Sequence, residues 1–291
     1  MNTNTQSLRN FISISILLAL TACGGGGGSN STSAPQTPLD SSPPVETVTV
    51  SGGVQKGPFI VGTSVLVNIL DESGNPTDST ILTEITDSIG SFSFSVDENS
   101  IVQIAAEGYY YNELNGNLSN GTLSLKAIYS ASGDNNNQAY VNILTHLIND
   151  RVLELIRTEN LDVDSAISQS QAELISALEP VLHVENISSF TNLSIFNESN
   201  GNENGNGYLL ALSTAFYHYA ESTAEGTSSS ADAQLSLILN QITDDFATDG
   251  TINQNNFTNN LTSALRSLNP SAITENLINR SSIGVLPRFY G

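Results

Sequence analysis

The sequence predicts a multidomain α+β protein, with a disordered N-terminal tether, an antiparallel β-sandwich of about seven strands and an all-α helical domain. Three patterns support this prediction. Residues 23–46 are rich in Gly, Ser, Thr and Pro and contain almost no apolar side chains. Apolar residues alternate with a period of two over residues 47–130, and from residue 140 to 291 they recur at helical spacing. A polar linker at residues 131–139 separates the two periodic regions.

The N-terminal residues have the layout of a secretory signal. The first residues are polar with one positive charge at Arg9, and an apolar run follows from Phe11 to Leu20. This run is too short to cross a bilayer, which needs ~20 apolar residues, and it fits the apolar region of a signal peptide. We therefore expect residues 1–22 to be a signal peptide.

The end of this segment resembles the lipobox of bacterial lipoproteins. Leu20, Thr21, Ala22 and Cys23 match its pattern of an aliphatic residue, two small residues and a cysteine. The resemblance implies a lipoprotein signal peptide and lipidation of Cys23, including a palmitate-type acyl chain. Each buried CH₂ would contribute ~0.8 kcal/mol to anchoring. The alternatives are ordinary secretory cleavage with a spare cysteine, or an uncleaved N-terminal helix; Cys23 is the single cysteine of the chain.

Residues 23–46 should form a disordered tether, because a segment of this composition cannot bury a core. A flexible chain of this length spans roughly 25–30 Å on average. In the lipoprotein interpretation, this distance would separate the folded part from the lipid headgroups.

The composition limits the possible partners. Of 291 residues, 8 are Lys or Arg and 29 are Asp or Glu, which gives a formal net charge of −21. Such a chain would be repelled by nucleic acid and by anionic membrane surfaces. A cation, a cationic partner or a neutral glycan remains possible, although the absence of Trp weakens the case for an aromatic carbohydrate platform. A single cysteine also excludes an internal disulfide.

The period-two region contains short β-branched runs separated by turn signals such as Lys56-Gly57-Pro58 and Asn115-Gly116. Runs at this spacing predict an antiparallel sandwich. The residues expected to face its core are Val65, Val67, Ile69, Ile81, Ile85, Phe92, Phe94, Val102, Ile104, Leu123 and Leu125.

Three motifs in this region resemble the carboxypeptidase regulatory-like domain, a transthyretin-like seven-stranded sandwich. Ser51–Val54 followed by Gly62–Val67 is similar to its opening, Thr86–Phe94 to its "T-D-x-x-G-x-F-x-F" hairpin, and Ala106–Tyr109 to its closing "a-x-G-Y". The resemblance covers about residues 47–130. It implies a largely non-catalytic module of exported and outer-membrane proteins, with no active-site residues to transfer.

Tyr109, Tyr110 and Tyr111 form the densest aromatic cluster of the sequence. The simpler interpretation is that alternate tyrosines close the core and the sheet edge, as tyrosines in strands commonly do. The other interpretation is that the three line a binding surface. We keep them as candidate site residues.

The helical region begins with an apolar stripe from Val141 to Ile156. Asp164 is the expected cap of a second helix that stops at Pro180. Further amphipathic runs follow at about 207–221, 231–247, 254–268 and 270–281, the last with an Asn269-Pro270 start. The runs "VNILTHLINDRV" and "AEGYYYNELNG" are similar to bacterial lipoproteins in which this sandwich precedes an uncharacterised helical domain.

The sequence contains no strong catalytic motif. The histidines are His146, His183 and His218, none with a second ligand pair at metal-like spacing, and no G-x-S-x-G elbow is present. Paired carboxylates lie in turn-like or helix-end contexts. The segment 197–207 has alternating oxygen side chains, as in a calcium loop, but asparagine replaces the anionic ligands, and a flexible loop is the alternative. We predict no catalytic residue, no metal ligand and no cofactor.

We therefore expect a lipid-anchored, non-enzymatic protein of the cell envelope that acts as a surface or periplasmic binding or scaffold module. Its expected partners are the membrane, through Cys23, and an envelope protein or glycan, with no nucleic acid. Gly24 follows Cys23, where an aspartate would resemble an inner-membrane retention signal, and this favours the outer membrane of a Gram-negative bacterium. One alternative is an enzyme or enzyme accessory subunit with a site in the helical domain; another is a cation- or calcium-binding envelope protein.

Overall fold

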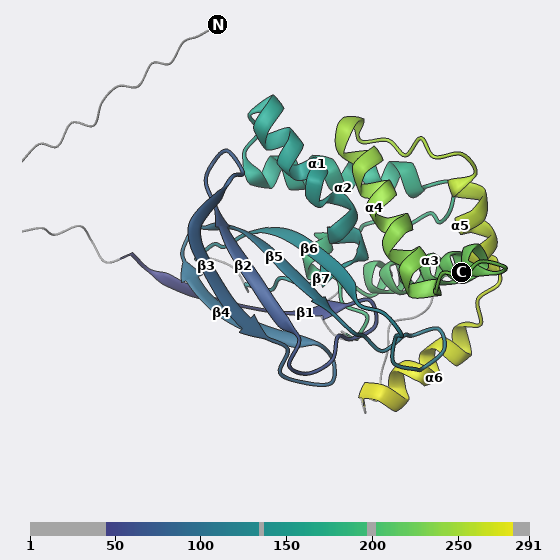
Figure 1. Cartoon of the computed structure of the whole chain (residues 1–291). Coiled ribbons are helices and arrows are strands. Elements are labelled where there is room, and N and C mark those ends of the chain that lie inside the picture. The colour runs from purple at the N-terminus through teal and green to yellow at the C-terminus, as the bar shows by residue number, and fades with distance from the viewer. Residues whose placement is uncertain (1–44, 134–136, 197–201, 282–291) are drawn as a thin grey trace, which may run out of the picture. The chain divides into compact units, whose positions relative to one another are not determined.

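Strands form where the period-two runs predict them. The computed structural model describes residues 45–133, 137–196 and 202–281, and in these it shows a mixed α+β fold with two β-sheets and six α-helices (Figure 1). The strands are β1 (Thr47–Gln55), β2 (Ser64–Leu70), β3 (Pro76–Glu84), β4 (Ser91–Asp97), β5 (Ile101–Gly108), β6 (Leu123–Ser130) and β7 (Val141–Asn142). Residues 47–130 thus contribute six strands, where about seven were predicted, and the short β7 belongs to the start of the helical region.

The strands form one four-stranded sheet in the order β3-β2-β5-β6 and one three-stranded sheet in the order β4-β1-β7. All neighbouring strands are antiparallel, as predicted, except β1 and β7, which pair in parallel. The buried residues of both sheets belong to one apolar cluster, which also includes residues of the helices. Sheets and helices therefore share a core within a single compact unit, to which the described residues 45–133, 137–196 and 202–281 belong.

The predicted inward residues are buried, with two exceptions. Ile69 and Ile81 are only partly buried and pack at the margin of the core. The register between β2 and β3 shifts between Asn68 and Leu70, and a shift of one residue moves the next side chain to the other face. Leu70, which is 6% exposed, is therefore buried in place of Ile69.

The turn predicted at residues 87–90 is present, but the segment does not form the hairpin that its motif resembles, because β3 and β4 on either side of the turn belong to different sheets. Gly90 has φ +86°, and a Cβ built on it would lie 2.6 Å from the carbonyl oxygen of Val54. Asp87 stabilises the same turn, because its Oδ1 accepts hydrogen bonds from the backbone N–H groups of Ile89 at 3.1 Å and Ser91 at 2.9 Å. Glycine is thus required at residue 90 both by the backbone angle and by the close approach.

The segment predicted as a linker packs against the strands at both of its ends. Ala131 and Ala139 are fully buried, and Ala139 N donates to Ser51 O at 2.9 Å. Residues 134–136 of this segment lie outside the described residues. The linker ends therefore contribute to the core that the sheets and helices share.

The helices are α1 (Ile143–Glu159), α2 (Val163–Leu178), α3 (Glu203–Ala224), α4 (Ala231–Asp249), α5 (Phe257–Arg266) and α6 (Pro270–Ser281), with a short 3-10 helix η1 (Phe190–Asn192). The predicted cap of the second helix was wrong. Asp162 is the N-cap, because its backbone is extended and its side chain accepts from Ser165 N at 2.9 Å. Asp164 lies in the first turn instead. Asn269 caps α6 as predicted, accepting from Ala272 N at 3.3 Å.

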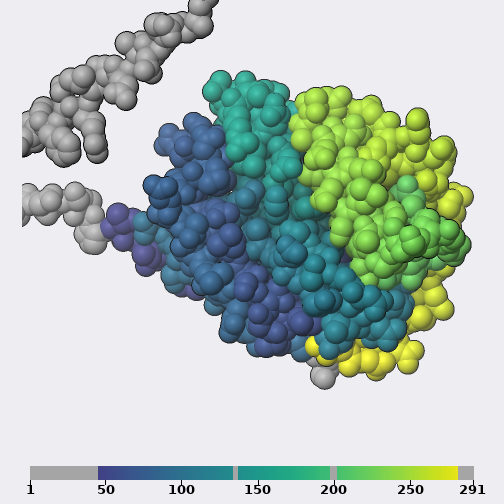
Figure 2. All heavy atoms as spheres, viewed as in Figure 1, coloured from purple at the N-terminus to yellow at the C-terminus, as the bar shows by residue number. Residues whose placement is uncertain are grey.

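Helix α1 connects the strands to the other helices. It packs on β6, α2 and α4, and Figure 2 shows the purple-to-blue strands and the teal-to-yellow helices as one continuous surface. Arg151 of α1 donates to both carboxylate oxygens of Glu173 on α2, at 2.8 and 3.0 Å, and to Thr248 O at the end of α4 at 3.2 Å. One side chain therefore joins three helices.

Over the described ranges, none of the helices has the length and apolar character needed to span a membrane.

Candidate ligand-binding cavity

The single cysteine, Cys23, lies outside the described residues. The three candidate tyrosines are described, and they do not share one environment. Tyr110 is fully buried, and its hydroxyl donates to Asp232 Oδ1 at 2.7 Å, whereas Tyr109 is 42% exposed. Tyr111 stacks under the guanidinium of Arg280, which lies 3.4 Å from its ring centre. A surface formed by this cluster would consist of Tyr109 and Tyr111 alone.

The three histidines lie on different segments, with His146 on α1, His183 after α2 and His218 on α3. His183 is exposed and hydrogen-bonds Glu179, four residues earlier in the chain, which raises the pKa of the imidazole. His146 is 5% exposed, and its Nδ1 has no hydrogen-bond partner among the described residues. Burial, reinforced by Lys126, lowers its pKa to about 4, although Asp150 opposes the shift.

His218 on α3 donates a hydrogen bond through Nδ1 to Glu221 Oε2 at 3.2 Å and lines a hollow of about 320 Å³ between α3 and α5. The serine hydroxyls of this hollow donate to backbone carbonyls of their own helices, and none has a hydrogen bond to the imidazole. The histidine and the carboxylate are thus in place, but the hollow contains no serine paired with His218 that could serve as a nucleophile.

The segment considered as a calcium loop is only partly described, because residues 197–201 lie outside the described ranges. From Glu203 the chain is helical, and the Oδ1 of Asn206 accepts from Ser194 N at 2.9 Å. Asn204, Gly205 and Asn206 therefore belong to α3 and not to a loop. Across residues 45–133, 137–196 and 202–281, no cluster of three or more His, Cys, Asp or Glu side chains could hold a metal ion.

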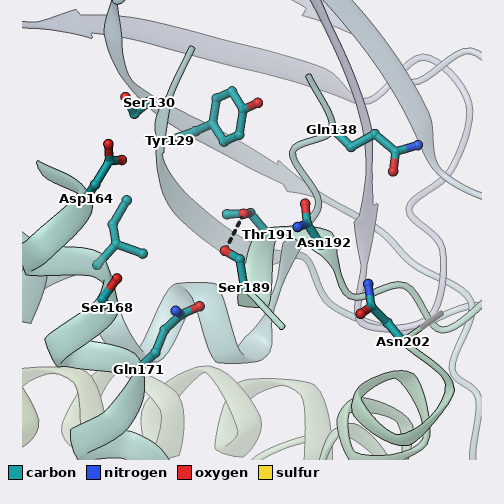
Figure 3. A pocket seen from close by; sticks show the side chains of 11 residues that line it. Tyr129, Ser130, Gln138, Asp164, Ser168, Gln171, Ser189, Thr191, Asn192 and Asn202 are labelled. Atoms are coloured by element: carbon teal, nitrogen blue, oxygen red, sulfur yellow. Dashed lines mark hydrogen bonds between the residues drawn. The ribbon is translucent and has the colours of Figure 1, made fainter. Parts of the chain in front are cut away.

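A cavity larger than the hollow at His218 lies between the end of β6, the first half of α2, η1 and the start of α3. It has a volume of about 650 Å³, within the range typical of small-molecule sites. Figure 3 shows its side chains around an open space, with Asp164, Ser168 and Gln171 on one side, Gln138 and Asn202 on the other, and Ser189 and Thr191 between them. We call this space the polar cavity.

The lining of the polar cavity is rich in neutral hydrogen-bonding groups. Of its eleven described residues, ten are polar, one is aliphatic (Ile167), and Asp164 is the one with a charge. The hydroxyls and amides come from Tyr129, Ser130, Gln138, Ser168, Gln171, Ser189, Thr191, Asn192 and Asn202. No cation is among these lining residues, so an anionic ligand would find no opposite charge there. A neutral ligand with many hydroxyl groups matches the lining in both charge and hydrogen bonding.

Local hydrogen bonds hold the walls of the cavity in place. Gln171 Oε1 on α2 accepts from Phe190 N at 2.5 Å, which fixes η1 against α2. Tyr140 N donates to Thr191 O at 2.7 Å, and the hydroxyls of Ser189 and Thr191 are 2.8 Å apart. The first two contacts join η1 to α2 and to the segment before β7, and they fix the walls of the cavity relative to one another.

Tyr129 supplies the aromatic group of the cavity. Its hydroxyl donates to Asn137 Oδ1 at 3.2 Å, and the same oxygen accepts from Ser132 N at 3.3 Å. Burial raises the pKa of the Tyr129 hydroxyl, and the nearby carboxylate of Asp164 raises it further. The phenol therefore stays protonated at neutral pH and acts as a neutral polar group.

Of the lining residues, only Asp164 has a marked place in the sequence pattern, as a candidate helix cap, and the others carry no local signal. Serine, threonine, asparagine and glutamine are common throughout the chain, so their presence in any one segment carries no signal. The polar cavity exists because β6, α2, η1 and α3 meet, and that meeting depends on long-range packing.

Comparison of the chain with protein-family models, with curated proteins and with solved structures gives no match in any of the three.

Proposed function

We propose that this protein is a lipid-anchored, non-enzymatic module of the cell envelope that binds a neutral, polyhydroxylated ligand such as a glycan in the polar cavity. The observation that carries the proposal is the lining of the cavity, with many hydroxyl and amide groups, one carboxylate and no cation among its described residues. Sugars offer alternating hydroxyl donors and acceptors, which such side chains can pair with.

The charge of the chain supports the same class of ligand. With a formal net charge of −21, the protein disfavours nucleic acid and other polyanions as partners. Asp164 adds one acceptor that binds a sugar hydroxyl more strongly than a neutral group would, because hydrogen bonds to ions are the stronger ones. Tyr129 adds the face of an aromatic ring in a chain without Trp.

The proposed anchor rests on the sequence alone. The lipobox-like residues Leu20 to Cys23 would place the lipid ahead of the tether, and Gly24 favours the outer membrane. A transthyretin-like arrangement of the sheets, as in the carboxypeptidase regulatory-like domain, is part of the same proposal and is supported by the motifs of residues 47–130. In this proposal, the sheets support the helical part that helps to form the cavity.

Ligand binding is tested by calorimetric titration of the full chain with chitotriose, cellotriose and maltotriose. Binding of at least one of the three is expected. Asp164→Ala should weaken this binding about tenfold or more, because a hydrogen bond to a charged group contributes about 1.5–3 kcal/mol. Asp244→Ala removes the same charge from an exposed residue of α4 outside the polar cavity and should leave binding unchanged. Equal weakening by both variants, or no binding of any of the three sugars, would contradict the proposal for these ligands.

Membrane anchoring is tested separately by fractionating cells that produce the full chain or Cys23→Ser. The serine variant should move from the membrane fraction to the soluble fraction, because it cannot form the thioether. A Cys23→Ser chain that remains fully membrane-bound would disprove the lipid anchor without affecting the ligand proposal.

An esterase-type hydrolase is a second candidate, favoured by the hydrogen bond between His218 and Glu221 in the hollow beside α5. In such an enzyme, the carboxylate would orient the imidazole as a general base. Hydrolysis of a chromogenic acetate ester, lost in His218→Ala and retained in the exposed His183→Ala, would support it. Hydrolysis at the same rate in both variants would exclude His218 as the base.

A further inference from the structure

A second group of polar side chains lies in the interior, away from the polar cavity. Lys56 follows the last residue of β1, Glu113 lies in the loop after β5, and Ser213 is on α3. The side chains of Lys56 and Glu113 are both 0% exposed, and Ser213 is fully buried. We call these three residues, with Tyr110 and Tyr217, the buried lysine cluster.

The contacts in this cluster hold an amine against a carboxylate oxygen, and both side chains are fully shielded from solvent. Lys56 Nζ lies 2.7 Å from Glu113 Oε1, and the hydroxyl of Ser213 donates to the same oxygen. The ring centres of Tyr110 and Tyr217 lie 5.5 and 5.2 Å from Nζ. Tyr110 is fully buried and Tyr217 is 5% exposed, so the two rings cover the amine with apolar surface.

Hydrogen bonding compensates this ion pair only in part. Glu113 Oε2 is buried and has no hydrogen-bond partner among the described residues. Removing each ion of a pair from water costs several kcal/mol, and the pair recovers this only when the remaining lone pairs and protons are also hydrogen-bonded. A reaction that converts the two charged groups into neutral ones would therefore be favoured at this site.

The backbone holds the two groups at this approach. Asn276 on α6 donates through Nδ2 to Glu113 O at 3.1 Å and to Leu114 O at 3.0 Å. Gly57 has φ +61°, and a Cβ on it would lie 1.7 Å from Tyr111 O and 3.1 Å from Glu113 Oε2. The chain after Lys56 can therefore lie this close to the loop of Glu113 only with glycine at residue 57.

We propose that Lys56 and Glu113 join in the folded chain through an amide bond between Nζ and Cδ. The ammonium first passes a proton to Oε1 along the existing hydrogen bond, which leaves a neutral amine beside a carboxylic acid. The lone pair of Nζ then forms the new bond to Cδ while the C=O electron pair moves onto Oε2, and Ser213 keeps its hydrogen bond to Oε1, the oxygen that departs. A second proton moves from Nζ to the departing oxygen, the C–O bond breaks, and one water molecule leaves.

This condensation needs no oxidant, reductant or co-reactant, since an ammonium and a carboxylate give an amide and water. Its driving force is proximity: groups held in reacting geometry reach effective molarities on the order of 10⁵–10⁸ M. The product would close a covalent loop from the end of β1 to the loop after β5, beneath α3.

The test is the intact mass of the full chain, purified folded and then denatured, with and without substitution of each lysine. The chain has two lysines, so Lys126→Arg is a matched control for Lys56→Arg. The native chain and Lys126→Arg should each be lighter than their composition by one water molecule. Lys56→Arg and Glu113→Ala should have their full mass, because neither can form the amide.

Peptide mapping locates the bond. Trypsin should fail to cleave the denatured native chain after Lys56, and fragmentation should connect Lys56 to Glu113. A native chain of full mass that is cleaved after Lys56, or a water loss that maps to other residues, would overturn the proposal. If the substituted chains fail to fold, the mass and peptide map of the native chain still decide between these outcomes.

Discussion

Replacing Arg151 with methionine tests whether the three-helix junction stabilises the fold. The side chain of Arg151 is 8% exposed, and that of its partner Glu173 is 24% exposed. Methionine keeps the apolar stem but removes both charge-assisted hydrogen bonds to Glu173 and the contact to the end of α4. The carboxylate of Glu173 then keeps one side-chain hydrogen bond, from Gln169 Nε2 at 2.9 Å.

The expected loss follows from the exposure of the pair. Removing one partner of a fully buried ion pair costs about 3–5 kcal/mol, whereas exposed pairs contribute about 0–1 kcal/mol. Because Glu173 is partly exposed, we expect a loss of about 2–3 kcal/mol in the free energy of unfolding for Arg151→Met. For a chain of this size, this corresponds to a decrease in Tm of about 4–12 °C.

Urea unfolding of the full chain followed by circular dichroism measures the difference. Arg157→Met is the matched control, because Arg157 is an exposed residue of the same helix with a hydrogen bond to Gly74 O at 2.7 Å. It should cost less than about 1 kcal/mol. Equal losses for the two variants, or a loss below about 1 kcal/mol for Arg151→Met, would refute the assigned role.

The same pair predicts a pH dependence. Burial alone would raise the pKa of Glu173, but the hydrogen bonds from Arg151 and Gln169 outweigh it and hold the pKa below its ordinary 4.5. A carboxylate with a lowered folded-state pKa contributes stability that is fully present above 4.5 and is lost as the pH falls through the folded-state pKa. The difference between the native chain and Arg151→Met should therefore shrink in acid.

Three further substitutions are informative. Between pH 6.5 and about 4, the unfolded histidine takes up a proton and the folded one does not, so acidification lowers the free energy of unfolding of the native chain by about 3 kcal/mol through this residue. His146→Gln should lack this contribution. Unfolding experiments at several pH values measure the difference. Gly90→Ala should lower the free energy of unfolding by about 1–3 kcal/mol, since positive φ and the contact with Val54 both oppose a Cβ; an unchanged Tm would contradict this. Tyr110→Phe should cost about 1–3 kcal/mol in urea unfolding, because Asp232 loses a buried donor, and a neutral result would mean that water replaces it.

Much of the strand and helix pattern could be predicted, because alternation and helical periodicity are local properties. Phe92 and Phe94 are buried on one face, as their spacing required, and Asn269 caps α6. The incorrect predictions lie where the three-dimensional structure departs from the local sequence pattern. The shift between Asn68 and Leu70 cannot be read from the run SVLVNIL, and Asp162 competes with Asp164 for the same cap.

The sites were harder to predict than the fold. In the sequence, Lys56 belongs to the turn signal Lys56-Gly57-Pro58. The residues around Glu113 show no pattern that predicts a buried carboxylate. The one sequence signal at Lys56 is that it is one of only two lysines and directly follows a predicted strand. Even then its partner lies 57 residues away, and only the assembled fold brings the two together.

The position of β1 in its sheet has a mechanical consequence. The N-terminal segment joins the described fold at Thr47, so a pull along that segment is applied lengthwise to β1. β1 is paired with β4 from Thr47 to Gly53 and, at its other end, with β7 at Val54 and Gln55. A force along such a strand loads the hydrogen bonds of both pairings, β1–β4 and β1–β7, at the same time and does not break them one after another. Tension from the N-terminus would thus be shared between the two edges of β1, and the helices that follow β7 would be shielded until both ladders yield.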